Sequence, residues 1–479
     1  MSIISVAAKL LKNLNFRYGE KLYNKNPAEP IAPAVPDKIE NAVSDCFCVG
    51  YSITDVMPDD MDKKKYYVAG YRMNNPATGV LNPMTASAVW MDDKSGRGGV
   101  VFCSIDTVGM TSYDVNVIRD SLKDFVSRTG CRSINILSTH NHSGIDTMGL
   151  WGPIPKSGRD EAYMKIVHDG AKKVIEQAYE DRRDGDLFYG TKETPDIQRD
   201  SRDPQVFSKV LARLRFVPYD GTKETWILNY ASHTESMLGK NSLVSADFAH
   251  YIREKISSEA DARVCYTVGA IGGLIRLKEL DPDNIKSTII GGHTIAQTAL
   301  EIDNERKLSP KINFIRQEFY AVADNILLVF AARAKIIKAK RYSEGKGSLS
   351  LSMKSEMTLF DIDGLKMLML PGEIFPELVY GGYLSAEESA TRKGPEINPK
   401  PLTEIAGDKE LLVFGLANDE IGYIVTPNDY YLHPTEPFIT GARDQDDRRH
   451  YEETNGLGPK TADKIAEVFT GMIKTFYEG

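Results

Sequence analysis

The sequence predicts a mixed α/β fold, in which one large domain carries mixed β-sheets flanked by helices. Short apolar stretches with the alternation of strands are separated by longer stretches with helical periodicity. Polar side chains gather where several predicted strands end, as in "SINILSTHNH" at residues 133–142. This is the edge at which α/β folds place the residues that contact ligands.

The main body is predicted to span residues 41–479 as a succession of strands and helices without an internal repeat. A strand at 46–58 opens it, and strands at 87–93 and 98–109 form a hairpin-type pair. A helix over 113–130 is expected to end at Gly130, because glycine readily adopts the left-handed conformation of a helix C-cap. The remaining elements are expected as a strand at 133–142, a helix at 159–181, a hairpin at 209–233, a helix at 245–260, a strand at 262–275, a helix at 290–303, long strands at 311–340 and a closing helix at 458–479.

Residues 1–40 are predicted to be an amphipathic helix followed by a proline-rich arm. Apolar residues at 3, 7, 10, 11 and 14 share one helical face, and the lysines lie largely off it. Such a helix packs on its own domain or on a partner subunit of a homo-oligomer, or it lies on a membrane surface. Four prolines between residues 24 and 38 exclude a helix or a central strand and predict an extended arm.

The bulk composition narrows the class of partner and the compartment. The net charge is −8 and no basic stripe is present, which argues against a nucleic-acid partner. Five cysteines, an odd number without a C-x-x-C pair, predict reduced thiols in a cytoplasm-like compartment. The N-terminus lacks the features of a signal peptide, so we expect a cytoplasmic protein, with peripheral membrane contact through the N-terminal helix as the alternative.

Two histidines, His140 and His142, stand at the carboxyl end of the predicted strand at 133–142. In an extended segment they project to the same side, and imidazole is a preferred ligand of zinc and similar ions. An isolated H-x-H pair is more often a pair of hydrogen-bonded loop residues. His233 and Glu373 also follow apolar strands, and ligands of this kind from distant parts of a chain are typical of a catalytic metal site. The residues alone leave both interpretations open.

Several common enzyme classes do not fit this pattern. A metallo-β-lactamase-type site needs H-x-H-x-D-H, and here His142 is followed by "SGIDT". The nucleophile elbow of serine hydrolases, G-x-S-x-G, is missing, as are a P-loop and a G-x-G-x-x-G loop.

A wider set of motifs resembles the neutral/alkaline (non-lysosomal) ceramidase family. "STHNHSGIDTMGLWGP" resembles its histidine motif, "FCVGYSITDVMP" its opening strand, and "NYASHTESMLGKNSLVSADF" its second histidine segment. "LPGEIF", "GLANDEIGYIVT" and "YEETNGLGPKTADKI" resemble later motifs in the same order. The resemblance runs from about residue 46 to the end of the chain.

The resemblance implies a set of site residues and a cofactor. It implies one zinc ion held by His140, His233, Glu373 and Tyr423, with His142, Arg199 and Tyr451 near the substrate. Arg202 lies close to Arg199, and the sequence leaves open which of them faces the site. The stretch after His142, "SGIDTMGLWGP", is then expected to form a wall of the pocket rather than to supply further ligands.

The implied activity is hydrolysis of an amide, as in an N-acylated sphingoid base, by a metal-activated water. Members of the family carry a G-D-V-S-P-N segment with a functional serine, whereas this chain has "VGAIGGLIR" at 268–276. That glycine-rich segment is expected to be structural or to open the pocket to a different substrate. Two alternatives therefore remain: a ceramidase-like binding protein without catalysis, and a metallohydrolase that acts on a non-ceramide amide or ester.

Overall fold

The computed structural model describes residues 9–10, 21–22, 24–343 and 351–478. The amphipathic helix predicted at the N-terminus falls almost wholly outside these ranges, and its proposed membrane or subunit contact stays a prediction. Across the described ranges, no helix has the length and apolar character needed to span a bilayer.

Nine strands of the described chain form the larger sheet, in the order β11-β9-β8-β6-β1-β3-β4-β5, with β13 paired to β6. Most neighbours are antiparallel, but β4 and β5 are parallel, as are β9 and β11. The strands are β1 (Phe47–Asp55), β3 (Thr85–Asp92), β4 (Val100–Ile105), β5 (Ser133–Ser138), β6 (Arg183–Glu193), β8 (Val210–Pro218), β9 (Glu224–Tyr230), β11 (Ala262–Val268) and β13 (Arg306–Leu308). The hairpins predicted at 87–109 and 209–233 are confirmed as β3–β4 and β8–β9.

The larger sheet curls strongly, which explains how its distant strand ends meet. In the sheet order β5 and β9 run in opposite directions. Each strand of a twisted sheet is rotated by roughly 20–25° relative to its neighbour. Six such neighbour pairs separate β5 from β9, so the accumulated twist rotates β9 by about 120–150° relative to β5. The curl brings β11 back against β4, where the Ser104 hydroxyl donates to the Tyr266 carbonyl at 2.5 Å. The residues that follow β5 and β9 therefore lie side by side, and Asn141 and Thr234 form a parallel bridge there.

A second sheet packs face to face on the larger one. It contains β14 (Ile312–Val322), β16 (Leu351–Ile362), β17 (Leu365–Met369) and β19 (Leu412–Phe414) in that order, and β15 (Arg341–Ser343) pairs with β16. The two inner faces share one apolar core, in which Phe102 of the larger sheet meets Phe360 of the second with ring centroids 5.3 Å apart. Burial of such aromatic pairs is a main source of stability in a sandwich core.

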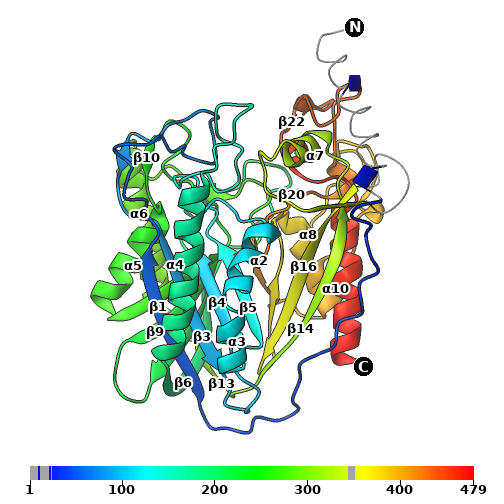
Figure 1. The fold of residues 1–479 in the computed structure, drawn as a ribbon. Helices are drawn as coiled ribbons and strands as arrows, with labels where there is room; N and C mark the ends of the chain where they lie inside the picture. The colour runs from blue at the N-terminus through cyan, green and yellow to red at the C-terminus, as the bar shows by residue number, and fades with distance from the viewer. Residues whose placement is uncertain (1–8, 11–20, 23, 344–350, 479) are drawn as a thin grey trace.

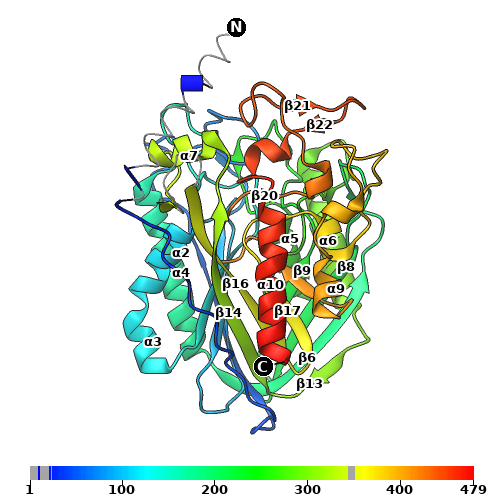
Figure 2. The same ribbon diagram turned by 90° about the vertical axis from the view of Figure 1, so that its right-hand side faces the viewer.

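Helices cover the two outer faces, so the molecule has four layers. The larger sheet is covered by α2 (Ser112–Ser121), α3 (Lys123–Thr129), α4 (Glu161–Glu180), α5 (Phe248–Glu259) and α6 (Asn284–Leu300) (Figure 1). The second sheet is covered by α8 (Pro376–Tyr380), α9 (Leu402–Ala406) and the closing helix α10 (Thr461–Tyr477), which crosses β14 and β16 (Figure 2). The predicted mixed α/β class is confirmed.

Several boundaries differ from those expected from the sequence. The helix predicted at 113–130 is divided into α2 and α3 at Leu122, although Gly130 does cap it in the left-handed conformation with φ 68°. The helix expected at 290–303 begins earlier, because the Asp283 carboxylate caps its first turn as α6. The stretch 311–340, expected as long strands, contains β14 and then the helix α7 (Ile326–Arg333), whose start is capped by the Asn325 side chain.

The proline-rich segment at 24–38 packs on the second sheet. Asp37 exchanges backbone hydrogen bonds with Phe314 of β14, and Pro27 bridges to Ser343 of β15.

The remaining elements are short strand pairs and 3-10 turns: β2 (Gly79–Val80) with β10 (Leu243–Val244), β7 (Gln198–Arg199) with β12 (Arg276–Leu277), β18 (Glu373–Ile374) with β20 (Tyr423–Ile424), β21 (Ala442–Arg443) with β22 (Arg449–His450), and η1 (Pro395–Ile397), η2 (Pro427–Asp429) and η3 (Glu452–Asn455). The pair β18–β20 lies beside the residues that follow β5 and β9, because Glu373 at the start of β18 contacts His140 and His233.

Candidate metal centre

His140 and His233 follow the carboxyl ends of β5 and β9 and have the same local arrangement. His140 Nδ1 lies 2.6 Å from the Val108 carbonyl oxygen, and His233 Nδ1 lies 2.9 Å from the Ile275 carbonyl oxygen. A carbonyl only accepts, so each Nδ1 carries the proton that it donates. Each neutral ring therefore presents the lone pair of Nε2, and this is the orientation found in metal-bound histidines.

Both Nε2 atoms point at one oxygen of Glu373. This residue begins β18 after a tight turn at Gly372, which has φ 82°. Glu373 Oε2 lies 2.9 Å from His233 Nε2 and 3.1 Å from His140 Nε2, and all three side chains are buried. Two imidazole lone pairs and a carboxylate oxygen would repel one another at these distances. The arrangement requires a cation between them, which is either a proton or a metal ion.

The pKa shifts of Glu373 and His140 likewise indicate that this buried cluster favours a bound positive charge. Burial alone would raise the pKa of Glu373, but His140 and His233 outweigh it and hold that pKa well below its usual range. Burial would likewise lower the pKa of His140, yet the Glu373 carboxylate raises it to about 9. A carboxylate that stays ionised beside two imidazoles is suited to hold a divalent ion.

The distances also suit such an ion. In a tetrahedral zinc site with bonds near 2.0–2.1 Å, the ligand atoms lie about 3.3 Å from one another. The observed separations of 2.9 and 3.1 Å need to open by only a few tenths of an ångström to reach that value. His140, His142 and His233 form the group of potential metal-ligating residues found in the described part of the chain, with ligand atoms within 4.8 Å of one another.

The Nδ1 atom of His142 faces a carboxylate, whereas the Nδ1 atoms of His140 and His233 face backbone carbonyls. Its Nε2 lies 3.0 Å from His140 Nε2, whereas its Nδ1 lies 3.0 Å from Oε2 of the buried Glu235. The approach to Glu235 has the length of an ion pair without the alignment of a hydrogen bond. Burial and then the charge of His140 lower the pKa of His142 to about 4, although Glu235 opposes them. Glu235 was not predicted as a site residue from the sequence, although it stands two residues after His233.

Neighbouring residues pack closely around His142. The Tyr71 ring meets it edge to face, with centroids 5.4 Å apart. A Cβ atom at Gly70 would lie 2.4 Å from the imidazole, so only glycine fits there. The loop that carries Glu235 is held by Asp247, whose carboxylate accepts from the backbone N–H groups of Ser236 and Met237 at 3.0 Å each. Asp247 stands near the end of the second histidine segment, "NYASHTESMLGKNSLVSADF", and fixes this loop through the two hydrogen bonds.

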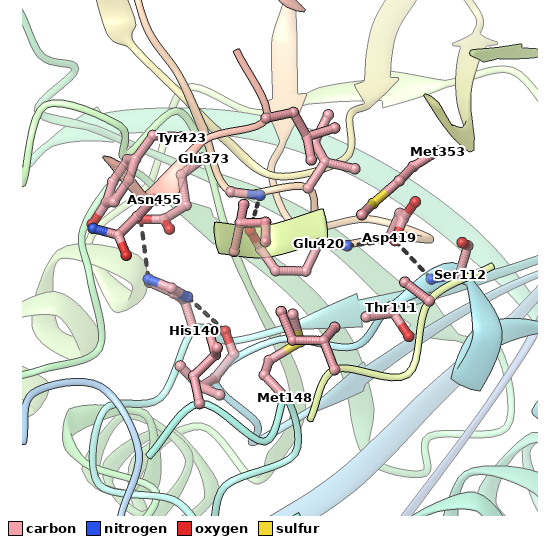
Figure 3. A pocket seen from close by; sticks show the side chains of 18 of the residues that line it. Thr111, Ser112, His140, Met148, Met353, Glu373, Asp419, Glu420, Tyr423 and Asn455 are labelled. Atoms are coloured by element: carbon pink, nitrogen blue, oxygen red, sulfur yellow. Dashed lines mark hydrogen bonds and ion pairs between the residues drawn. The ribbon is translucent and has the colours of Figure 1, made fainter. Parts of the chain in front are cut away.

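The histidine–glutamate centre forms one end of a largely apolar pocket (Figure 3). Tyr423 stands in register with Glu373 on the neighbouring strand β20, and its ring contacts Tyr451 with centroids 6.3 Å apart. Tyr451 is 51% exposed at the rim. The pocket is lined by His140, His142, Glu373, Tyr423 and Tyr451 together with apolar residues that include Met148, Leu150, Trp151, Leu328, Ile337, Met353 and Leu457.

The loop after the H-x-H pair forms a pocket wall, as expected. Met148, Leu150 and Trp151 line the pocket. The buried Asp146 shapes this wall, because its carboxylate accepts from the backbone N–H groups of Met148 at 3.0 Å, Gly149 at 2.6 Å and Trp151 at 2.8 Å.

Neither candidate arginine is among the residues that line the pocket. Arg199 is exposed on β7 and does not line the pocket. Arg202 is buried away from the pocket lining, where it pairs with Asp429 at 2.9 Å and Glu452 at 2.7 Å. Arg202 thus anchors the segment next to Tyr451. Arg276, opposite Arg199 in the β7–β12 pair, is the arginine whose backbone bridges to His233.

The glycine-rich segment 268–276 contacts the backbone next to Glu373 and the His233 ring, and its residues do not line the pocket. The backbone N–H of Gly272 donates to the Ile374 carbonyl at 2.8 Å, and the Ile275 carbonyl accepts from His233. A Cβ atom at Gly272 would lie 2.5 Å from backbone atoms of Ile374 and Phe375, next to Glu373. The segment is therefore structural, which is one of the two outcomes expected for it.

Replacing Gly272 with alanine is expected to destabilise the protein by about 1–3 kcal/mol, because the new methyl group must displace the backbone that carries Glu373. Thermal unfolding and metal titration measure the two effects, and we expect weaker metal binding as well. The matched control is Gly471→Ala on α10, where the added methyl group meets no atom and helix propensity rises. Equal melting temperatures for Gly272→Ala and the wild type would contradict the close approach.

The fold and the site together define a mixed α/β sandwich with a buried histidine–glutamate centre at the end of an apolar pocket. Residues 47–263 match the family model of the neutral/alkaline non-lysosomal ceramidases, N-terminal part. The predicted resemblance to that family is therefore confirmed, and the matched stretch includes His140, His142 and His233.

Solved structures support the fold. The neutral ceramidase from Pseudomonas aeruginosa matches with a TM-score of 0.66 at 16% identity, over 90% of this chain and 74% of that chain. A ceramidase complexed with C2 matches with a TM-score of 0.65 at 15% identity, over 90% of this chain and 75% of that chain. No curated protein sequence matches this chain. Part of the chain thus matches the ceramidase family model, and its fold is similar to that of solved ceramidases.

Proposed function

We propose that this chain is a zinc-dependent hydrolase that cleaves the amide bond of an N-acylated, lipid-like substrate. One observation carries the proposal. Two imidazoles, each with Nδ1 directed at a backbone carbonyl, turn Nε2 toward the same oxygen of Glu373. His140, His233 and Glu373 would hold the ion, and Tyr423 is the fourth ligand that the family resemblance implies. Tyr423 on β20 lies directly opposite Glu373 on β18 in the register of these two parallel strands.

A zinc ion at this place would lower the pKa of a bound water toward neutrality and polarise the scissile carbonyl. The chain's own residues would do the rest. Glu235 occupies the Nδ1 side of His142, which leaves Nε2 to hold a proton beside the reacting atoms. The Tyr451 hydroxyl would donate to the developing oxyanion from the rim of the pocket. Arg199 has no part in this proposal, because its side chain does not line the pocket.

The pocket lining supports a substrate with an apolar chain. Met148, Trp151, Leu328 and Met353 surround the space next to the centre. Burial of apolar surface would bind an acyl chain or a long-chain base there. A ceramide-like sphingolipid is accordingly the substrate class that we propose, with the amide as the bond cleaved.

Removal of the metal tests this function. The purified protein is dialysed against a chelator, and hydrolysis is measured on matched N-acyl amides and the corresponding esters. We expect no turnover without metal, return of activity at one zinc per chain, and cleavage of the amides. Full activity in the demetallated protein would refute the metal-dependent mechanism. Cleavage of esters alone would instead favour the ester-directed metallohydrolase.

A protein that binds one zinc per chain and retains N-acyl lipids, but hydrolyses neither series, would be the non-catalytic binding protein. The same preparations distinguish the two functions, because zinc content and lipid binding are measured beside turnover.

A further inference from the structure

Glu420 stands in the pocket between the metal centre and the far wall. Figure 3 shows His140, Glu373 and Tyr423 on one side and Asp419, Ser112 and Met353 on the other, with Glu420 between them. The residue belongs to the loop between β19 and β20, and its side chain packs over Gly109, where a Cβ atom would meet the Glu420 Cγ at 2.8 Å. A substrate that reaches from the centre into the pocket must pass alongside it.

One oxygen of this carboxyl group is satisfied and the other is not. Oε1 accepts from the backbone N–H of Gly422 at 2.7 Å. Oε2 is buried and has no hydrogen-bond partner among the described residues. The neighbouring Asp419 is different, because its carboxylate accepts from the backbone N–H of Ser112 at 2.7 Å. Glu420 Oε2 is thus an acceptor of the pocket wall that lacks a donor.

The charges around Glu420 do not supply that donor. Burial raises the pKa of Glu420 to about 8, and the negative charge of Glu373 adds to this effect while His140 opposes it, so the ionised carboxylate is favoured only when a further cation lies beside it. Lys340 also lines the pocket, but its ammonium group lies over the Tyr342 ring, 5.0 Å from the centroid. Among the ion pairs of the described residues, none includes Glu420.

A hydrogen-bond donor for Glu420 Oε2 would therefore have to come from a bound ligand. Burying an unpaired carboxylate oxygen against an alkyl chain costs free energy, whereas a charge-assisted hydrogen bond to it is among the stronger polar contacts in proteins. The lining near Glu420 also includes the apolar side chains of Ile421 and Met353. Specificity at such a wall comes from a few polar groups of this kind.

We propose that Glu420 is a specificity-determining residue that receives a protonated amine of the substrate, close to the acyl bond that is cleaved. The substrate class is then an N-acyl compound with a second, cationic nitrogen next to the amide. This inference deepens the proposed function and rests on it, since it assumes that the acyl bond lies at the histidine–glutamate centre. An ammonium group fits better than a hydroxyl, because Asp419 and Glu420 together place two carboxyl groups at this wall.

Three substrates that differ in one group test the inference. They share an acyl chain and an amide, and the group two carbons from the amide nitrogen is an ammonium, a hydroxyl or a methyl. For the zinc-loaded wild type we expect kcat/KM to be highest for the amine. In Glu420→Gln we expect kcat/KM for the amine to fall by about 10- to 100-fold, the range for loss of a hydrogen bond to a charged group. The methyl compound should be cleaved as before.

The matched control is Glu467→Gln, which changes an exposed carboxylate of α10 and should leave all three values unchanged. Zinc content is measured in every variant. Equal losses on all three substrates, or loss of zinc from Glu420→Gln, would overturn the inference, because Glu420 would then serve the reaction or the metal rather than the amine.

The same compounds separate this inference from the proposed function. If the wild type cleaves the amides and Glu420→Gln retains the preference for the amine, the inference fails and the proposed function stands. If the wild type cleaves none of them, the proposed function fails, and calorimetric binding of the amine and methyl compounds to wild type and Glu420→Gln decides the role of Glu420. Equal affinities of the wild type for both compounds would then refute it.

Discussion

Replacing His233 with alanine is expected to release the metal and to abolish hydrolysis. His233 has two functions in the structure. It presents Nε2 to Glu373 at 2.9 Å, and it connects the centre to the glycine-rich segment through the Ile275 carbonyl. Removal of the ring deletes a proposed ligand and leaves Glu373 with a single imidazole partner. Because changes to residues behind the ligands already cost 10- to 100-fold in affinity, we expect the loss here to exceed about 100-fold.

The measurement is zinc content after gel filtration, followed by titration of the demetallated protein. His140→Ala serves as a second variant, since His140 approaches the same Glu373 oxygen from β5. The matched control is His293→Ala on α6, a half-exposed histidine outside the pocket lining. Circular dichroism shows whether each variant is folded. Folded His140→Ala and His233→Ala proteins that keep one zinc per chain would refute the centre.

Replacing His142 with alanine is expected to have the opposite pattern, with zinc retained and turnover lost. His142 reaches the centre through Nε2, but its other nitrogen faces Glu235. A general acid–base group contributes about 100- to 10,000-fold to a rate, so kcat should fall within that range. KM should change much less, because the apolar walls that bind the substrate chain are untouched.

Glu235→Gln tests whether the carboxylate positions His142. The amide preserves the shape of the side chain but removes its charge, and we expect kcat to fall by about 10- to 100-fold with zinc content unchanged. Glu235→Asp should recover part of the rate if the charge is what matters. Loss of zinc from His142→Ala would show instead that all three histidines are ligands, which is the other arrangement that their mutual distances allow.

The ligand-type residues could be found from the sequence because each follows an apolar strand at a recognisable turn. His140 follows β5, His233 follows β9, and Glu373 follows β17 after the Gly372 turn. These signals are local, since alternation of side chains and a turn glycine depend on neighbouring residues alone. The arginine could not be assigned in this way. Arg199 and Arg202 are three residues apart, and neither lines the pocket.

The sequence by itself determined the fold class and the order of most strands and helices, because these follow from local periodicity and caps, whereas the candidate ligand set, Tyr423 included, is what the resemblance of its motifs to the ceramidase family implies. Only the tertiary structure decided that Glu235 faces His142 and that Glu420 presents an oxygen without a partner. Both facts depend on burial and on the approach of segments about 90 to 280 residues apart, which the curl of the larger sheet and its packing on the second sheet bring about. A carboxylate looks the same in a sequence whether it is solvated or buried, and its chemistry differs between the two.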